Sequence, residues 1–346
     1  MNLFAGSYTQ MIAPAFGGHG DGLYSMEFDP INGNIKVVST RHLVNPSYLT
    51  VINDNLYTFN EVSLDEEPFL YAFKVGENQI LKFINKVPVD GAYACHINYS
   101  QKYACLFVSC YGGGNVLAFP VGTDGSVKPA LYNIRHEGSS IHADRQEAPH
   151  VHYIAVDDES DRIFVSDLGI DKIMIYELKN QNNEISISYK ESILIPEGSG
   201  PRHLIIHPGK KYLFVLTELS AEVVLIDIST KKVITSVKLI SDSGIIPGAA
   251  AIKISGDGKH IYASERSTNQ IFVLKFDDYN KSLELIQSVE TQVITPRDFM
   301  LDSSGNWLIV AGQDSDSLAV FERNPFSGTV AFHKMFENFN SISCII

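Results

Sequence analysis

Charged and imidazole side chains recur at two positions of a repeated unit in this sequence. We expect each unit to begin with a strand. The start of this first strand and the segment just before it supply Arg145, Gln146, His150, His152, Arg202 and Arg297. The end of the second expected strand supplies Asp167, Glu218, Arg266, Gln313 and Asp314. Four of the eight arginines of the chain belong to this set. Because a planar guanidinium binds carboxylate or phosphate through two parallel hydrogen bonds, the pattern indicates a pocket for an anionic small molecule.

Proton transfer could be carried by an imidazole or a carboxylate of the same set. His150 and His152 lie two residues apart on an expected strand and therefore share one face. Each pattern also has a structural interpretation: the histidines could be core residues or a two-histidine metal site, and Arg202 and Arg297 could bond neighbouring loops. Asp167 and Glu218 could pair with those arginines. The sequence lacks GxSxG, HExxH and zinc-ligand spacings, so we expect neither a metal nor a cofactor.

Short strands in a repeat of about fifty residues must position these side chains. Each unit begins with an apolar strand and continues through a polar turn, a second apolar strand, a polar loop and a third strand. Unit starts at residues 46, 94, 149, 201, 247 and 296 are spaced by 48, 55, 52, 46 and 49 residues. Short apolar runs such as residues 212–216 exclude a helical solenoid. Such evenly spaced β units indicate a β-propeller.

The seventh unit is split between the two ends of the chain. Residues 2–9, 22–29 and about 34–43 read as its second, third and fourth strands, and residues 341–346 read as its missing first strand. We therefore predict an all-β, seven-bladed β-propeller with four antiparallel strands per blade, forming a single domain over residues 1–346. The C-terminal strand would close the ring by joining the N-terminal strands, which removes exposed sheet edges. Starts of first strands and ends of second strands would then share one face of the disc.

Composition narrows the classes of partner and location. Hydrophobic residues make up 45% and charged residues 19%, which is typical of a globular chain. A net charge of −13 repels nucleic acid and anionic membranes, so we expect neither as a partner. The N-terminus reads as a strand rather than a secretion signal. Four cysteines without a CxxC pair indicate buried reduced thiols, and we expect a cytoplasmic monomer or weak homodimer.

Five groups of residues spread over the chain carry a family resemblance. They are Gly6-Ser7-Tyr8-Thr9, Arg145-Gln146-x-x-Pro149-His150-x-His152, Ser166-Asp167-Leu168-Gly169-x-Asp171-Lys172, Gly200-Pro201-Arg202-His203-Leu204, and Pro296-Arg297-x-Phe299 with Gln313-Asp314-Ser315-Asp316. Through them the chain resembles the propeller-type lactonase family, which includes bacterial 6-phosphogluconolactonases and is similar to fungal carboxy-muconate lactonising enzymes. The family's catalytic histidine, arginines and glutamate match His150 or His152, Arg202, Arg266 and Glu218. Three features depart from the family pattern: Glu265 where Asn is frequent, Ala94 where Pro is common, and the bland stretch 248–251.

The resemblance implies hydrolysis of 6-phospho-D-glucono-1,5-lactone in the pentose phosphate pathway. In that reading His150 or His152 activates water, with Glu218 as the alternative base, and Arg202 stabilises the oxyanion. Arg266 or Arg297 would hold the phosphate, and the remaining residues of the set would contact the substrate. Two alternatives use the same residues: a carboxy-muconate-type cycloisomerase, and a non-enzymatic propeller that binds a protein or peptide. A calcium-dependent lactonase would need a Glu, Asn and Asp ligand set that the sequence does not make evident, although Asp167 and Glu218 leave this alternative open.

Overall fold

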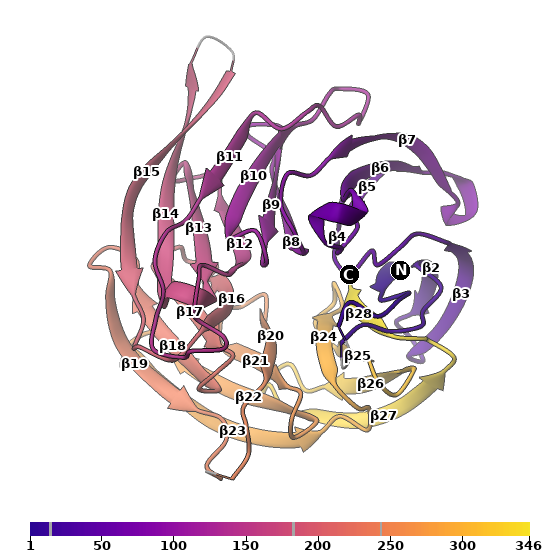
Figure 1. The fold of residues 1–346 in the computed structure, drawn as a ribbon. Coiled ribbons are helices and arrows are strands. Elements are labelled where there is room, and N and C mark those ends of the chain that lie inside the picture. The colour runs from indigo at the N-terminus through magenta and orange to yellow at the C-terminus, as the bar shows by residue number, and fades with distance from the viewer. Residues whose placement is uncertain (14–15, 182–183, 243) are drawn as a thin grey trace. The chain divides into compact units, whose positions relative to one another are not determined.

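The computed structural model describes residues 1–13, 16–181, 184–242 and 244–346, and these are mostly strands. The described strands form seven four-stranded sheets (Figure 1). The chain divides into two compact units, which we call the first unit (Met1–Val44 with Ile205–Ile346) and the second unit (Asn45–Leu204). The single domain expected over residues 1–346 stays a prediction.

The second unit contains three sheets whose neighbouring strands run antiparallel. Their strands are β4 (Leu49–Ile52), β5 (Asn55–Phe59), β6 (Phe69–Val75) and β7 (Leu81–Pro88); β8 (Ala94–Ser100), β9 (Cys105–Cys110), β10 (Asn115–Pro120) and β11 (Tyr132–Arg135); and β12 (Val151–Asp157), β13 (Arg162–Asp167), β14 (Lys172–Gln181) and β15 (Glu184–Leu194). The described helical turns are short and belong to the 3₁₀ class: η1 (Leu64–Glu66), η2 (Glu77–Gln79) and η3 (Leu168–Ile170).

Three further sheets lie within the first unit. Their strands are β20 (Ala249–Ile254), β21 (His260–Glu265), β22 (Gln270–Asp277) and β23 (Ser282–Glu290); β24 (Pro296–Leu301), β25 (Trp307–Gly312), β26 (Ser317–Arg323) and β27 (Val330–Glu337); and β28 (Ile342–Ile345), β1 (Asn2–Ser7), β2 (Leu23–Asp29) and β3 (Asn34–Arg41). The remaining sheet begins where the chain passes from the second unit back to the first, with β16 (Pro201–Ile206), β17 (Tyr212–Thr217), β18 (Glu222–Asp227) and β19 (Lys232–Lys238).

The two ends of the chain complete one sheet together. Strand β28 runs antiparallel to β1, with Cys344 facing Gly6. Phe4 N donates to the Ile346 carbonyl oxygen at 2.8 Å, and Ile346 N donates to the Phe4 carbonyl oxygen at 2.9 Å. Figure 1 shows the yellow C-terminal strand beside the indigo N-terminal strands. The predicted closure by residues 341–346 is therefore confirmed.

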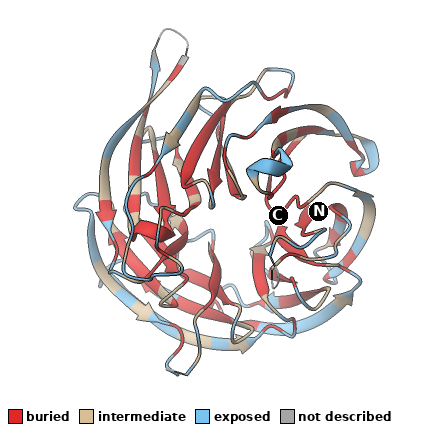
Figure 2. Ribbon diagram, in the orientation of Figure 1, coloured by how far each residue is buried: buried red, intermediate tan, exposed pale blue. Residues whose placement is uncertain are grey.

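Burial differs between the inner and outer strands of a sheet. In the first unit, β25 is buried at every residue, whereas β27 is exposed along most of its length (Figure 2). Inner strands meet neighbouring sheets on both faces, so they are continuously apolar instead of alternating. Trp307 shows such a contact: its ring meets Phe28 edge-on at 5.9 Å, and its Nε1 donates to the Pro30 carbonyl oxygen at 2.9 Å.

All four cysteines are buried and free, as the sequence predicts. Burial raises the pKa of Cys105 to about 12 and that of Cys110 well above its ordinary value. Both thiols therefore stay protonated and unreactive near neutral pH. Within the described residues, the helices are all too short to cross a membrane.

Candidate functional site

A β-bulge recurs near the start of the first strand in five of the described sheets. In β12, Val151 faces Asp167 while Tyr153 faces Ser166, so His152 is the extra residue. A bulge bends its strand and re-aims the side chain of the extra residue. Equivalent register shifts occur at Cys95, at Ala250 with Ala251, at Arg297 and at Ser343. Two predicted site residues, His152 in the second unit and Arg297 in the first, therefore occupy the same local backbone position at the bulge.

His150 precedes this bulge, and both of its ring nitrogens contact protein acceptors. Nδ1 lies 3.1 Å from the carbonyl oxygen of Tyr111, and Nε2 lies 3.1 Å from Oε1 of Glu147. A carbonyl oxygen only accepts hydrogen bonds, so Nδ1 carries a proton. A bond from its own backbone amide, together with the neighbouring His150, lowers the pKa of Glu147. His150 is thus held at both nitrogens, and its side chain is only 10% exposed.

His152 belongs to a cluster of aromatic and imidazole rings in the second unit. Its ring lies 5.4 Å from that of His203, and His203 lies 4.6 Å from Tyr153. His96 stacks on Tyr153, with ring centroids 3.7 Å apart. His152 thus lies in one cluster with His96 and His203, which come from the repeats before and after its own. His96 and His203 are both buried in it.

Hydrogen bonds define the protonation state of two of these rings. Ile154 N donates to Nδ1 of His96 at 3.2 Å, so this nitrogen is an acceptor. Nη1 of Arg202 lies 2.9 Å from Nε2 of His203, and a guanidinium can only donate. Both histidines are therefore neutral in this arrangement. Arg202 is 2% exposed and uses one of its five N–H donors on His203.

Asp167 and Gln146, predicted to contact substrate, are fully buried. Oδ1 of Asp167 accepts from the backbone N of His150 at 2.8 Å, and Oδ2 lies 2.7 Å from Nδ1 of His136. Nε2 of Gln146 donates to the carbonyl oxygen of Leu168 at 2.8 Å. Both side chains thus bind the protein's own groups and join the segment before β12 to the end of β13. Their contact with substrate stays a prediction.

Glu218 and Arg266 form an ion pair in the first unit, with Oε2 and Nη2 3.2 Å apart. Nε of Arg266 also donates to the Gly248 carbonyl oxygen at 2.8 Å. The Gly248 amide in turn donates to Oε1 of Glu265 at 2.6 Å, and Oε2 of Glu265 accepts from Thr268 N. The bland stretch at residue 248 therefore supplies a backbone acceptor for Arg266. The buried carboxylate of Glu265 holds the backbone of Gly248 in place through this hydrogen bond.

Arg297 and Gln313 lie against the segment that follows β1. The guanidinium of Arg297 lies 5.2 Å from the ring centroid of Tyr8 and 4.9 Å from that of Phe16. Aromatic faces attract a cation, and the attraction grows when water is excluded; Arg297 is 9% exposed. Nε2 of Gln313 donates to the Gly17 carbonyl oxygen at 3.3 Å.

The four arginines of the predicted pocket are divided between the units. Arg145 and Arg202 lie in the second unit, and Arg266 and Arg297 lie in the first. Nη2 of Arg145 lies 3.4 Å from the hydroxyl of Tyr111. Convergence of all four guanidinium groups at one mouth stays a prediction.

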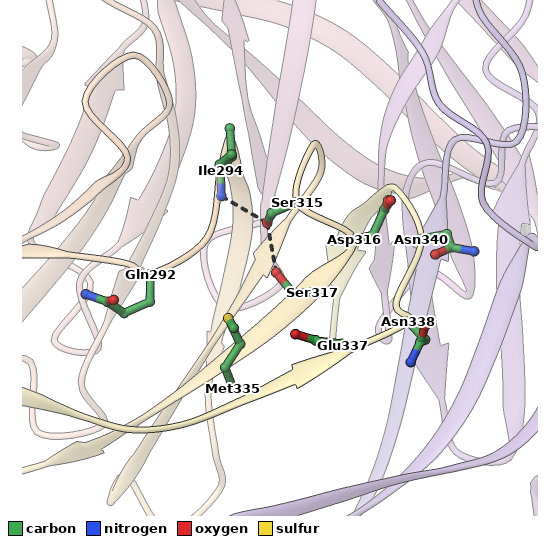
Figure 3. Close-up of a pocket in the computed structure, with 9 residues that line it drawn as sticks. All are labelled: Gln292, Ile294, Ser315, Asp316, Ser317, Met335, Glu337, Asn338 and Asn340. Carbon is green, nitrogen blue, oxygen red and sulfur yellow. Dashed lines mark hydrogen bonds between the residues drawn. The ribbon is translucent and has the colours of Figure 1, made fainter.

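A separate pocket of about 390 Å³ opens beside β27 in the first unit (Figure 3). Ile294 N donates to Oγ of Ser315 at 2.9 Å, and this hydroxyl lies 2.8 Å from that of Ser317. The residues lining the pocket are Gln292, Ile294, Ser315, Asp316, Ser317, Met335, Glu337, Asn338 and Asn340. Ser315 and Asp316 belong to a motif of the family resemblance, but the predicted catalytic and substrate-binding residues are not among those that line this pocket.

Sequence reasoning missed two polar residues at a position that the repeat defines, and a third polar residue next to one of them. Tyr111 follows β9 directly, as Glu218 follows β17 and Arg266 follows β21. Asn60 follows β5 in the same way, and Asn60 and the next residue, Glu61, are 6% and 5% exposed. Continuing the comparison of second-strand ends into the less regular early units would have found them.

The model of the family described as Lactonase, 7-bladed beta-propeller, matches residues 2–346. The chain belongs to this family. This lactonase-family chain is 30% identical over 335 residues to the 6-phosphogluconolactonase of Bacillus subtilis, covering 94% of this chain and 92% of that protein. It is 29% identical to the 6-phosphogluconolactonase of Formosa agariphila, covering 94% and 93%.

A solved structure supports the same assignment. The periplasmic gluconolactonase of Pseudomonas aeruginosa matches this lactonase-family chain with a TM-score of 0.89 and 27% identity, over 100% of this chain and 98% of the other. The predicted seven-bladed propeller with four antiparallel strands per blade is confirmed. The resemblance found in the motifs is confirmed with it.

Proposed function

We propose that this chain hydrolyses 6-phospho-D-glucono-1,5-lactone to 6-phosphogluconate. The similarity to the Bacillus subtilis 6-phosphogluconolactonase, over 94% of the chain, carries the proposal. The arginines at repeat positions support an anionic substrate, since guanidinium groups bind phosphate well. As part of the same proposal, the enzyme works in the pentose phosphate pathway of the cytoplasm, without a cofactor, as a monomer or weak homodimer.

Lactone hydrolysis needs an activated water and a donor for the developing oxyanion. We assign His152 to the water, because its ring lies 5.4 Å from that of His203, which contacts Arg202, the residue assigned to the oxyanion. The water oxygen attacks the lactone carbonyl carbon while His152 takes its proton. The ring C–O bond then breaks, and the leaving oxygen takes the proton from the imidazolium. Arg202 donates to the oxyanion in this scheme.

The remaining residues receive supporting roles. Arg266 or Arg297 is assigned to the phosphate of the substrate, and Arg145 to substrate binding. Glu218 is the alternative base, but a carboxylate paired with a guanidinium is a weaker proton acceptor. Gln146 and Asp167 hold the segment that carries the histidines. Gln313 is assigned to the substrate's hydroxyl groups.

An assay on two lactones tests the proposal. Hydrolysis of 6-phospho-D-glucono-1,5-lactone and of unphosphorylated glucono-1,5-lactone is followed against the uncatalysed rate, with and without EDTA. We expect a higher kcat/KM for the phosphorylated lactone and no effect of the chelator. Absence of acceleration on either lactone would refute the proposed hydrolase. A preference for the unphosphorylated lactone would refute the proposed substrate. Loss of activity in EDTA would refute a mechanism without a metal.

A further inference from the structure

Tyr111 contacts three of the predicted site residues of the second unit. Its ring lies parallel to that of His150, with centroids 4.4 Å apart and planes 10° apart. It meets His152 edge-on at 5.7 Å and 78°. Its hydroxyl lies 3.4 Å from Nη2 of Arg145. One side chain thus touches a predicted water-activating ring and a predicted anion-binding group.

Hydrogen bonds also hold the backbone of Tyr111 in place. Its carbonyl oxygen accepts from Nδ1 of His150 at 3.1 Å, and its amide donates to the Tyr93 carbonyl oxygen at 2.9 Å. Three glycines follow it, and a Cβ on Gly114, at φ +57°, would lie only 2.8 Å from the Pro149 carbonyl oxygen. The glycine turn therefore lets this segment pass directly against the residue that precedes His150.

The position of Tyr111 in the repeat adds an independent observation. It stands directly after the second strand of its sheet, the place that Glu218, Arg266 and Gln313 take in theirs. The repeat thus puts a polar or charged side chain at this position in several sheets. In this sheet the side chain is a phenol instead of an ion.

We propose that Tyr111 is a positioning residue, whose hydroxyl orients Arg145 and whose ring orients His152. The kinetic consequences rest on the function proposed above. Arg145 is assigned to substrate binding, so loss of the hydroxyl acts on KM. His152 activates water, so loss of the ring acts on kcat.

The first experiment compares Tyr111→Phe with Tyr132→Phe. Tyr132 lies on β11 of the same sheet, and its hydroxyl donates to the Ile185 carbonyl oxygen at 3.3 Å, so each change removes one bonded hydroxyl. We expect Tyr111→Phe to raise KM for the phosphorylated lactone by roughly 3- to 10-fold, the effect of one hydrogen bond, with kcat nearly unchanged. We expect Tyr132→Phe to change neither constant. An unchanged KM in Tyr111→Phe, or an equal change in the control, would overturn the inference.

The second variant, Tyr111→Leu, removes the ring as well. We expect its kcat to fall by about tenfold or more below that of Tyr111→Phe, because His152 loses its edge-on support and misplaced reacting groups cost rate steeply. Equal kcat values for the Phe and Leu variants would contradict the role of the ring. Thermal unfolding of both variants shows whether each is folded at the assay temperature.

A measurement without substrate separates this inference from the proposed function. Imidazole nitrogen NMR signals of His150 and His152 are assigned with His150→Gln and His152→Gln, then recorded in Tyr111→Leu and Tyr132→Phe. We expect both signals to move in Tyr111→Leu and neither to move in Tyr132→Phe. If the signals move while the wild-type protein hydrolyses no lactone, the positioning role stands and the function fails. If the protein is active but the signals stay in place, the positioning role fails.

Discussion

Arg202 is the most deeply buried of the arginines at the predicted site, and His203 orients its guanidinium. A preorganised donor to an oxyanion contributes roughly 10²–10³ in rate. We therefore expect Arg202→Ala to lower kcat/KM for the phosphorylated lactone by that factor, measured in the steady-state assay.

Two other arginines serve as controls for this substitution. Arg162, at the start of β13, is half-buried, and Arg135 is an exposed residue whose guanidinium lies 3.8 Å from Asp90. Arg135→Ala and Arg162→Ala change the net charge of the protein by the same amount as Arg202→Ala. We expect Arg135→Ala to keep its activity and Arg162→Ala to lose far less than Arg202→Ala. Similar losses in all three would indicate a general field effect and contradict the assigned role.

The two neighbouring histidines are expected to differ in their effect on catalysis. His152→Ala should lower kcat by roughly 10²–10⁴, the range typical of a general base. His150→Ala should cost less, because both ring nitrogens of His150 are bonded to protein acceptors instead of a reactant. Single-turnover rates of the two variants provide the measurement. A larger loss in His150→Ala would reverse the assignment.

At the scale of elements, closure by β28 is the feature most open to test. Ile342 and Ile345 are fully buried in the sheet shared with β1. Removing a buried isoleucine side chain costs about 2–5 kcal/mol, a large part of the stability of an ordinary domain. We expect Ile342→Ala to lower the melting temperature by several degrees, and deletion of residues 341–346 to lower it more. Ile346→Ala, at a half-buried position, is the control, and an unchanged melting curve for the deletion would contradict closure.

The sheet β20–β23 carries a second stability prediction, on pH. Burial, with nearby Arg323, lowers the pKa of His260 below its ordinary 6.5. The unfolded chain therefore binds more protons than the folded one in the window from 6.5 down to the folded pKa, so acidification through that window destabilises the fold. We expect the free energy of unfolding to fall between pH 7.5 and pH 5.5, measured by urea denaturation.

A substitution separates the contribution of His260 to the pH dependence of stability from the contributions of other titrating groups. His260→Gln removes the titrating ring, and we expect its unfolding free energy to depend less steeply on pH over the same window. Asp257, Lys259 and Lys275 also act on the ring and remain in place as the background. Equal slopes in the two proteins would exclude His260 as the source.

At the scale of the whole molecule, the net charge of the protein and its local arginine side chains act on an anionic substrate in opposite directions. A net charge of −13 repels an anionic substrate at long range, whereas guanidinium groups attract it over a few ångströms. The arginines are few and concentrated at the repeat positions where the proposal needs them. The acidic surface and an anionic substrate are therefore compatible.

The repeat, its strand pattern and the closing strand were all readable from the sequence. The period of about fifty residues, the all-apolar runs such as residues 212–216, and the strand-like tail at residues 341–346 are local patterns, and strand formation follows such patterns. The observed strands β28, β1, β2 and β3 agree closely with the expected ones. The family followed from motifs that stand at fixed places in this repeat.

Only the tertiary structure decided what each side chain of the candidate site touches. Asp167 meets His136 across 31 residues of sequence, and Tyr111 meets His150 across 39. The sequence placed His150 and His152 on one face without distinguishing them, because tautomer and bonding depend on partners that other strands supply. A bulge of one residue also re-aims a side chain, and it leaves no mark in the alternation of apolar and polar residues. The repeat thus determines where polar groups gather, whereas long-range contacts determine the role of each.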